Sequence, residues 1–217
     1  MTAEKKKGLI FDLDGVICFT DRYHYLAWKE LTDHIGVPFD ETTNNRLRGV
    51  SRMASLEIIL ERSEKNYSPE EKFAMTEEKN QLYRRLLESM SPSDLTDEVR
   101  STLSELRSRG YRLGIGSSSK NTKTILAQIG LASFFDAIAD GTDITHSKPD
   151  PEVFLIAAER LGFPPAECVV IEDAKAGIQA AKAAGMTAFA LFGNAKGCGI
   201  EDYDLKSFRD LLSVLPG

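Results

Sequence analysis

Glycines that close helices recur in the second half of this 217-residue chain, and they constrain its fold more than any other feature. At each one, a run with helical periodicity ends at a glycine that an apolar residue follows. The four positions are Gly110-Tyr111, Gly130-Leu131, Gly162-Phe163 and Gly185-Met186. Because glycine readily adopts the left-handed conformation that ends a helix, the recurrence predicts successive helix–strand units. Short apolar strands that alternate with helices form a parallel sheet covered on both faces.

The expected strands are short apolar segments between those helices. They are Arg112–Gly116, Ala137–Ala139, Cys168–Ile171 and Thr187–Leu191. Another apolar run begins at Gly8, and a last covering helix is expected at Leu205–Leu215. Together these elements predict an α/β fold with a Rossmann-like parallel sheet.

Residues 21–91 have a different pattern, which is rich in charge and helical without strand-like runs. Side chains at spacings of three and four mark one helix face that ends at Gly36. They are His24, Trp28, Leu31 and Ile35. Ser68 and Pro69 suit the N-cap and first position of a later helix. One face of that helix carries Met75, Lys79, Leu82, Leu86 and Met90.

We therefore expect two domains, a core at residues 1–17 and 95–217 and an inserted all-helical cap at residues 18–94. Both connections would leave the sheet beside Asp12 and Asp14, so the cap could close over a site there. Lys79 is the charged member of its helix face. Either its stem covers apolar surface while the ammonium reaches water, or Lys79 has a functional role.

Composition argues against several classes of partner. The formal net charge of -6 and the pI near 5.2 provide no electrostatic footprint for nucleic acid or an anionic membrane. No run approaches transmembrane length, and the three cysteines form no Cys-x-x-Cys motif, so we expect a cytoplasmic protein. The three histidines are too scattered for a zinc cluster. Metal ligands would then be oxygen atoms, which favours magnesium.

Four polar features each follow a core strand, and parallel strands bring their carboxyl ends to one edge of a sheet. They are Asp12 with Asp14, the hydroxyl-rich Gly116–Ser119, the lysine segment Ser147–Pro151, and Glu172 with Asp173. Asp12 and Asp14 would share a direction if the backbone stays extended through Leu13.

This combination indicates phosphoryl transfer. Several carboxylates can bind a magnesium ion that also grips a phosphate. One aspartate can attack phosphorus, and a second can move protons. Each feature alone also has a structural explanation, namely a loop turn, a polar loop, a surface lysine or a helix N-terminus. Their joint occurrence after consecutive core strands favours a site.

With these motifs in this order and a helical insertion after the first, the chain closely resembles the haloacid-dehalogenase phosphotransferase superfamily. The resemblance covers nearly the whole chain. It implies that Asp12 is the nucleophile and Asp14 the general acid and base, while Ser117 and Lys148 hold the transferring phosphoryl group. The implied magnesium ligands are Asp12, Asp14 through its backbone carbonyl, Glu172 and Asp173.

Further segments resemble the β-phosphoglucomutase subfamily. They are Tyr23–Trp28, Leu47–Arg52 and Ser119–Asn121. The subfamily match implies that Arg52 grips a second, non-reacting phosphate, and that Thr20 and His24 join the catalytic set. The implied substrate-binding residues are Gly49, Val50, Ser51, Arg52, Trp28, Lys79, Ser118, Ser119, Lys120 and Asn121. One departure is Phe19, which stands where relatives commonly carry an acidic residue.

The resemblance implies a monomeric enzyme that interconverts β-D-glucose 1-phosphate and D-glucose 6-phosphate. It implies Mg²⁺ as cofactor, β-glucose 1,6-bisphosphate as phosphorylating activator, and small-molecule sugar phosphates as partners. A sugar-phosphate phosphatase on the same scaffold is the nearest alternative. A phosphorelay receiver also gathers aspartates, a hydroxyl and a lysine around magnesium, but the long helical insertion disfavours it.

Overall fold

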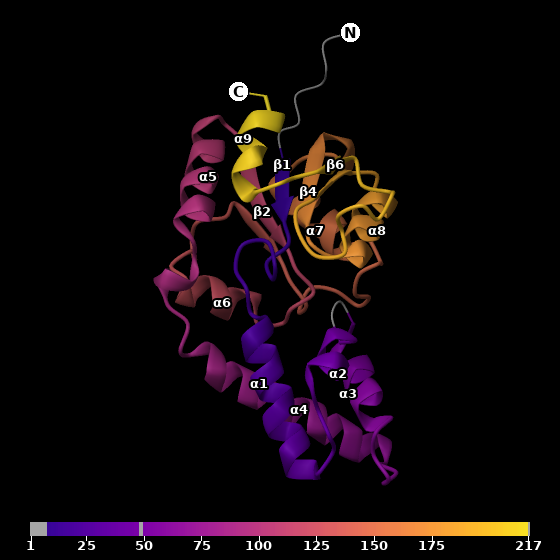
Figure 1. Ribbon diagram of the computed structural model, residues 1–217. Helices are drawn as coiled ribbons and strands as arrows, with labels where there is room; N and C mark the ends of the chain where they lie inside the picture. The colour runs from indigo at the N-terminus through magenta and orange to yellow at the C-terminus, as the bar shows by residue number, and fades with distance from the viewer. Residues whose placement is uncertain (1–7, 48–49, 217) are drawn as a thin grey trace. The chain divides into compact units, whose positions relative to one another are not determined.

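The computed structural model describes residues 8–47 and 50–216 (Figure 1). The chain divides into two compact units. One is formed by Met1–Phe19 with Ser91–Gly217, and the other by Thr20–Met90. The first is called the α/β unit below, and the second the helical unit.

The α/β unit is built on a six-stranded sheet with the strand order β3-β2-β1-β4-β5-β6. Its strands are β1 (Gly8–Phe11), β2 (Arg112–Gly116), β3 (Ala137–Ala139), β4 (Cys168–Glu172), β5 (Thr187–Ala190) and β6 (Tyr203–Asp204). All the neighbouring strands pair in parallel. The predicted Rossmann-like parallel sheet with an all-helical insertion is confirmed.

The central strand β1 positions the chemistry. Every residue of β1 and of β4 is buried, as expected for apolar strands with helices on both faces. In register, Phe11 lies beside Ile115 of β2 and Ile171 of β4. The residues that follow these three therefore emerge at the same level of the sheet edge.

Helices cover both faces of this sheet, and four of them end at the glycines from which their ends were predicted. They are α5 (Asp97–Ser108), α6 (Thr122–Gln128), α7 (Glu152–Leu161), α8 (Lys175–Ala183) and α9 (Leu211–Val214), with the 3-10 turns η1 (Pro92–Asp94), η2 (Pro165–Glu167) and η3 (Phe208–Asp210). The φ angles are 84° at Gly110, 80° at Gly130, 79° at Gly162 and 75° at Gly185, all left-handed.

Different helices pack on the two faces of β1, because successive side chains of a strand point in opposite directions. Ile10 packs in a buried cluster with Phe154 of α7 and Ile178 of α8. Phe11 instead stacks on Phe208 of η3, with ring centroids 5.7 Å apart. In Figure 1, α7 and α8 accordingly lie on one side of β1 and β4, and α5 and α9 lie on the other.

The C-terminal segment differs from the prediction of one helix over Leu205–Leu215. It follows the short edge strand β6 and contains only η3 and the four-residue α9. Asp210 explains the late start, because its carboxylate accepts hydrogen bonds from the backbone N–H groups of Lys206 and Ser207. These N–H groups are thereby capped at the beginning of the turn rather than bonded within a longer helix.

The helical unit contains four helices that the described residues form between Thr20 and Met90. They are α1 (Asp21–Ile35), α2 (Glu41–Asn45), α3 (Arg52–Leu60) and α4 (Pro69–Leu87). The predicted ends are confirmed at Gly36, which has a φ of 71°, and at Ser68, whose hydroxyl and Glu71 form a capping box. Met90 was expected on the face of α4 but lies beyond the helix end, where it is still buried.

Replacing Phe208 with alanine should destabilise the α/β unit by about 3–5 kcal/mol, because a buried aromatic ring against Phe11 would be lost. Urea unfolding followed by circular dichroism measures the change. Phe73→Ala is the control, since Phe73 is 63% exposed on α4 and its loss should change stability by about 0.5 kcal/mol or less. Equal losses in the two variants would contradict this packing.

Candidate functional site

A lysine bridges two carboxylates at the edge of the sheet. The Nζ atom of Lys148 lies 2.5 Å from Oδ1 of Asp12 and 2.6 Å from Oε1 of Glu172. The three side chains are 9%, 11% and 2% exposed in that order, so this is a nearly dry ion cluster. Buried charges need such partners, because an uncompensated charge in the interior is strongly destabilising.

Backbone hydrogen bonds extend the sheet by one residue at the points where the site begins. The N–H of Asp12 donates to the carbonyl of Ile171, and the N–H of Ser117 donates to the carbonyl of Ala139. Asp12 and Ser117 are therefore held by the strands themselves. The chain bends at Leu13, so the extended backbone expected between Asp12 and Asp14 is not present, and strand alternation does not relate their side chains.

Gly15 closes the turn after Asp14 and lies against Asp173. Its φ is 90°, and a Cβ atom at this position would lie 2.2 Å from Oδ2 of Asp173. The N–H of Gly15 donates to the carbonyl of Cys18, which makes the turn tight. A residue with a side chain would be strained here and would push Asp173 away.

Glu172 lies in a slot that Gly177 of α8 leaves open. A Cβ atom at Gly177 would lie 2.0 Å from both Cδ and Oε1 of Glu172. The other oxygen, Oε2, accepts a hydrogen bond from the N–H of Ala174 at 2.7 Å. The sequence analysis missed Gly177, although an isolated glycine inside a helical pattern is a signal of close packing.

The electrostatics of the cluster follow from burial and from excess negative charge. Burial raises the pKa of Asp12 to about 7, with Lys148 opposing the shift and Glu172 adding to it. Burial and then the charges of Glu172, Asp12 and Asp14 raise the pKa of Asp173 to about 8. Burial lowers the pKa of Lys148, but its two carboxylate partners outweigh this and leave the pKa above its ordinary value.

The donor types at this edge fit magnesium. Asp12, Glu172 and Asp173 carry carboxylate oxygens, the ligands that Mg²⁺ prefers, and the backbone carbonyl of Asp14 is the remaining predicted ligand, while Lys148 supplies only one positive charge. In residues 8–47 and 50–216, however, no three His, Cys, Asp or Glu side chains are gathered closely enough to hold a metal ion. The four residues accordingly stay a predicted ligand set.

The hydroxyl-rich loop after β2 is ordered by its own side chains. Ser117 is buried, and its Oγ accepts a hydrogen bond from the N–H of Ser119, whose Oγ accepts one from the N–H of Asn121. The Oγ of Ser118 is buried and has no hydrogen-bond partner in the described part of the chain. A buried hydroxyl without a partner is costly, so a ligand oxygen at this loop would be stabilising. Lys120 is exposed at the end of the loop.

A second cluster lies within the helical unit around Lys79. Its Nζ atom lies 2.7 Å from Nδ1 of His24 and above the rings of Trp28 and Tyr83, at 5.1 and 4.5 Å from their centroids. Lys79 is 3% exposed, so the alternative in which its ammonium reaches water is wrong. Burial, followed by the charges of Lys79 and Arg52, holds the pKa of His24 well below its ordinary value.

Tyr83 completes this cluster, and the sequence analysis did not single it out. Its ring stacks on His24 with centroids 4.1 Å apart, and its hydroxyl donates to Oγ1 of Thr20 at 3.1 Å. The available signal was its position one helical turn after Lys79. His24, Thr20 and Lys79, which were predicted separately, thus share one network, in which Thr20 and Lys79 are buried.

Arg52 is the first residue of α3 and is held by α4. Its Nη1 donates to Oε1 of Glu77 at 3.1 Å, and its Nη2 donates to Oδ1 of Asn80 at 3.0 Å. Ser51 caps α3 through a hydrogen bond from the N–H of Ala54 to its Oγ. Val50 is 42% exposed, and Gly49 lies outside the described residues.

Phe19, the departure from related sequences, packs within the α/β unit. Its ring lies 6.2 Å from that of Phe192, and its side chain is still 57% exposed. An aromatic contact therefore exists at the position where the resemblance implies a hydrogen-bonding carboxylate.

The predicted residues that the structure describes divide between the two units. The α/β unit holds Asp12, Asp14, Ser117, Ser118, Ser119, Lys120, Asn121, Lys148, Glu172 and Asp173, and the helical unit holds Thr20, His24, Trp28, Val50, Ser51, Arg52 and Lys79. The cluster at Lys148 is the candidate for the chemical step, because it combines a buried carboxylate with a cation.

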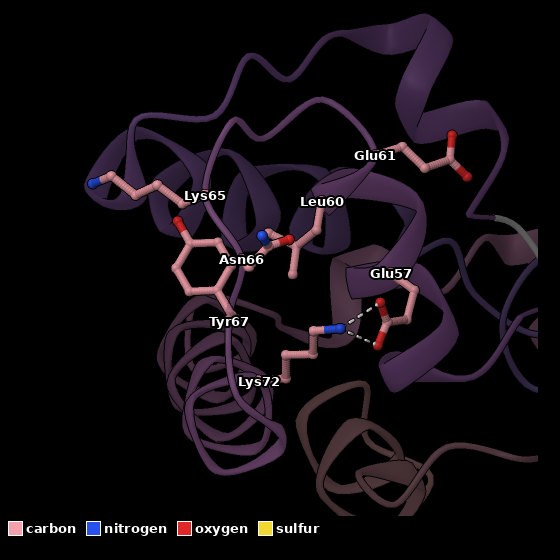
Figure 2. A pocket seen from close by; sticks show the side chains of 7 residues that line it. All are labelled: Glu57, Leu60, Glu61, Lys65, Asn66, Tyr67 and Lys72. Carbon is pink, nitrogen blue, oxygen red and sulfur yellow. Dashed lines mark hydrogen bonds and ion pairs between the residues drawn. The ribbon is translucent and has the colours of Figure 1, made fainter.

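Two hollows of about 280 Å³ each lie in the helical unit, and none of the predicted site residues lines them. The first, shown in Figure 2, is lined by Glu57, Leu60, Glu61, Lys65, Asn66, Tyr67 and Lys72. Both carboxylate oxygens of Glu57 bind the ammonium of Lys72 at 2.9 Å. These charged groups already satisfy each other, so this hollow gives no indication of a catalytic site.

Among the described residues, no helix is both long enough and apolar enough to span a membrane. Within the described residues, no disulfide involves Cys18, Cys168 or Cys198.

Known proteins resemble the chain over most of its length. A family model described as haloacid dehalogenase-like hydrolase matches residues 6–185. β-Phosphoglucomutase from Bacillus subtilis (strain 168) is 44% identical over 184 residues, which cover 84% of this chain and 81% of the relative. Fructose-1-phosphate phosphatase YqaB from Escherichia coli (strain K12) is 39% identical over 186 residues, covering 85% of this chain and 96% of the relative. A crystal structure of β-phosphoglucomutase from Clostridium difficile matches with a TM-score of 0.85 and 38% identity, covering 96% and 93% of the two chains.

Gly177→Ala should destabilise the protein by about 1–3 kcal/mol, because the added Cβ would overlap Glu172. Helix propensity alone predicts the opposite sign, a gain of about 1 kcal/mol. Urea unfolding decides between the two. In a Glu172→Ala background the overlap is gone, so there Gly177→Ala should stabilise. A gain of stability from Gly177→Ala in the wild-type background would contradict the close packing of Gly177 against Glu172.

Proposed function

The chain belongs to the haloacid dehalogenase-like hydrolase family, and on this premise we propose that it is a β-phosphoglucomutase, which interconverts β-D-glucose 1-phosphate and D-glucose 6-phosphate. One observation carries the choice of a mutase. Besides the Asp12–Lys148 cluster, the chain holds a half-buried guanidinium, that of Arg52, whose planar N–H groups suit a second phosphate. A hydrolase of monophosphates needs only one phosphate site.

Asp12 is the proposed nucleophile. One carboxylate oxygen attacks the phosphorus of β-glucose 1,6-bisphosphate, forms an O–P bond and releases the sugar oxygen, so an aspartyl phosphate and a hexose monophosphate result. Lys148 and Ser117 hold the transferring oxygens, with the lysine supplying positive charge beside Asp12. Mg²⁺, held by Asp12, Asp14, Glu172 and Asp173, would offset the remaining negative charge when bound.

Asp14 is the proposed general acid and base. It would protonate the departing sugar oxygen, and it would take the proton from the attacking hydroxyl in the return step. The phosphoryl group then passes from Asp12 to the other end of the sugar phosphate, which regenerates the bisphosphate. The sugar must reorient between the two steps, and Arg52 would grip whichever phosphate is not reacting.

The phosphatase alternative remains the second candidate, since the similarity to fructose-1-phosphate phosphatase YqaB supports it. In that case water would attack the aspartyl phosphate, and inorganic phosphate would be released in every cycle. Membership of the haloacid dehalogenase-like hydrolase family overturns the phosphorelay-receiver alternative.

The ratio of two products distinguishes mutase from phosphatase. The protein is given β-D-glucose 1-phosphate, Mg²⁺ and a trace of β-glucose 1,6-bisphosphate, and glucose 6-phosphate and free phosphate are followed together. We expect glucose 6-phosphate to form in large excess and only when the bisphosphate is present. Steady phosphate release without any bisphosphate would support the phosphatase and contradict the mutase.

Arg52→Ala should lower kcat/KM of the mutase reaction by about 10- to 100-fold, because charge-assisted hydrogen bonds to the second phosphate are lost. Hydrolysis of acetyl phosphate, which has no second phosphate, should change by about twofold or less. Arg46→Ala is the matched control, since Arg46 pairs with the exposed Glu61 on the same unit. An equal loss of both activities in Arg52→Ala would show that Arg52 has no distal-phosphate role.

A further inference from the structure

Arg52 already has an anionic partner inside the chain. The Nη1 of Arg52 binds a carboxylate oxygen of Glu77 at 3.1 Å, and the two side chains are 27% and 47% exposed. The residue that would anchor the second phosphate is therefore paired with a negative charge before any ligand arrives.

This carboxylate uses the same kind of bond that a phosphate would use. A guanidinium offers its N–H groups in a planar fork that suits carboxylates and phosphates alike. A phosphate that engages Arg52 through Nη1 must either displace Glu77 or bind beside it. In the second case the two negative charges repel each other at close range.

Glu77 is not the sole group that orients Arg52. The Nη2 of Arg52 donates to Oδ1 of Asn80 at 3.0 Å, and this contact comes from the next turn of the same helix, α4. Asn80 is neutral, so it holds the guanidinium without opposing an anion. Loss of the charge on Glu77 should therefore leave the position of Arg52 largely unchanged.

We propose that Glu77 is a specificity-determining residue that competes with the second phosphate for Arg52 and so sets how tightly sugar phosphates bind. This inference rests on the proposed function, in which Arg52 anchors that phosphate. A dianionic phosphate carries more charge than a carboxylate and replaces it, whereas an unphosphorylated sugar end cannot. The exchange thus favours phosphorylated ligands over free sugars.

Glu77→Gln tests the competition, because it removes the charge while keeping the size of the side chain. Binding of D-glucose 6-phosphate is measured by calorimetry without magnesium, so that no turnover occurs. We expect the Kd to fall about two- to fivefold in Glu77→Gln, the range for a partly exposed ion pair. In an Arg52→Ala background the same substitution should have no effect.

Glu78→Gln is the matched control for net charge. Glu78 is the next residue on α4 and pairs with Nδ1 of His34 at 2.9 Å. Its substitution should leave the Kd unchanged. Weaker or unchanged binding in Glu77→Gln, with a clear loss in Arg52→Ala, would overturn the competition and leave the proposed function intact. Unchanged binding in Arg52→Ala would overturn the distal-phosphate assignment itself. Thermal unfolding of each variant confirms that it is folded.

Discussion

The ammonium of Lys148 lies between the carboxylates of Asp12 and Glu172, and the architecture of the α/β unit makes this contact possible. Asp12 follows β1 and Glu172 ends β4, two parallel strands that are adjacent and in register. Without the lysine, two buried carboxylates would face each other with no counter-ion, at a large cost in stability. The lysine stabilises both charges and opposes the effect of burial on the pKa of Asp12, the proposed nucleophile.

The sequence was sufficient to predict the sheet and the residues at its edge, because both depend on local signals. Apolar strands between glycine-terminated helices predicted β2 and β3 at the residues where they occur. The slot at Gly177 was missed because it depends on how α8 packs over Glu172, a contact between elements that periodicity does not encode. The C-terminal segment was wrongly predicted as one helix. The hydrogen bonds from the backbone of Lys206 and Ser207 to the Asp210 side chain form a separate short turn, which the apolar pattern does not reveal.

In the helical unit, the sequence placed the charged residues but not their partners. Lys79 was recognised as unusual on an apolar face, yet only the structure shows its contact with His24 from another helix. The same holds for Arg52, which α4 contacts through Glu77 and Asn80. These contacts join α4 to α1 and α3, so they depend on tertiary packing. The binding of a phosphate by Arg52 stays a prediction. The contact with Glu77 adds that this phosphate must compete with a carboxylate for the guanidinium.

The most direct test of the account is to locate the phosphoryl group on the protein. The chain is incubated briefly with β-glucose 1,6-bisphosphate and Mg²⁺, quenched in acid and analysed by peptide mass spectrometry. The account predicts one phosphoryl group on Asp12, and none on the protein when Asp12 is replaced by asparagine. Phosphorylation at another residue, or turnover of sugar phosphates by Asp12→Asn at the wild-type rate, would contradict it.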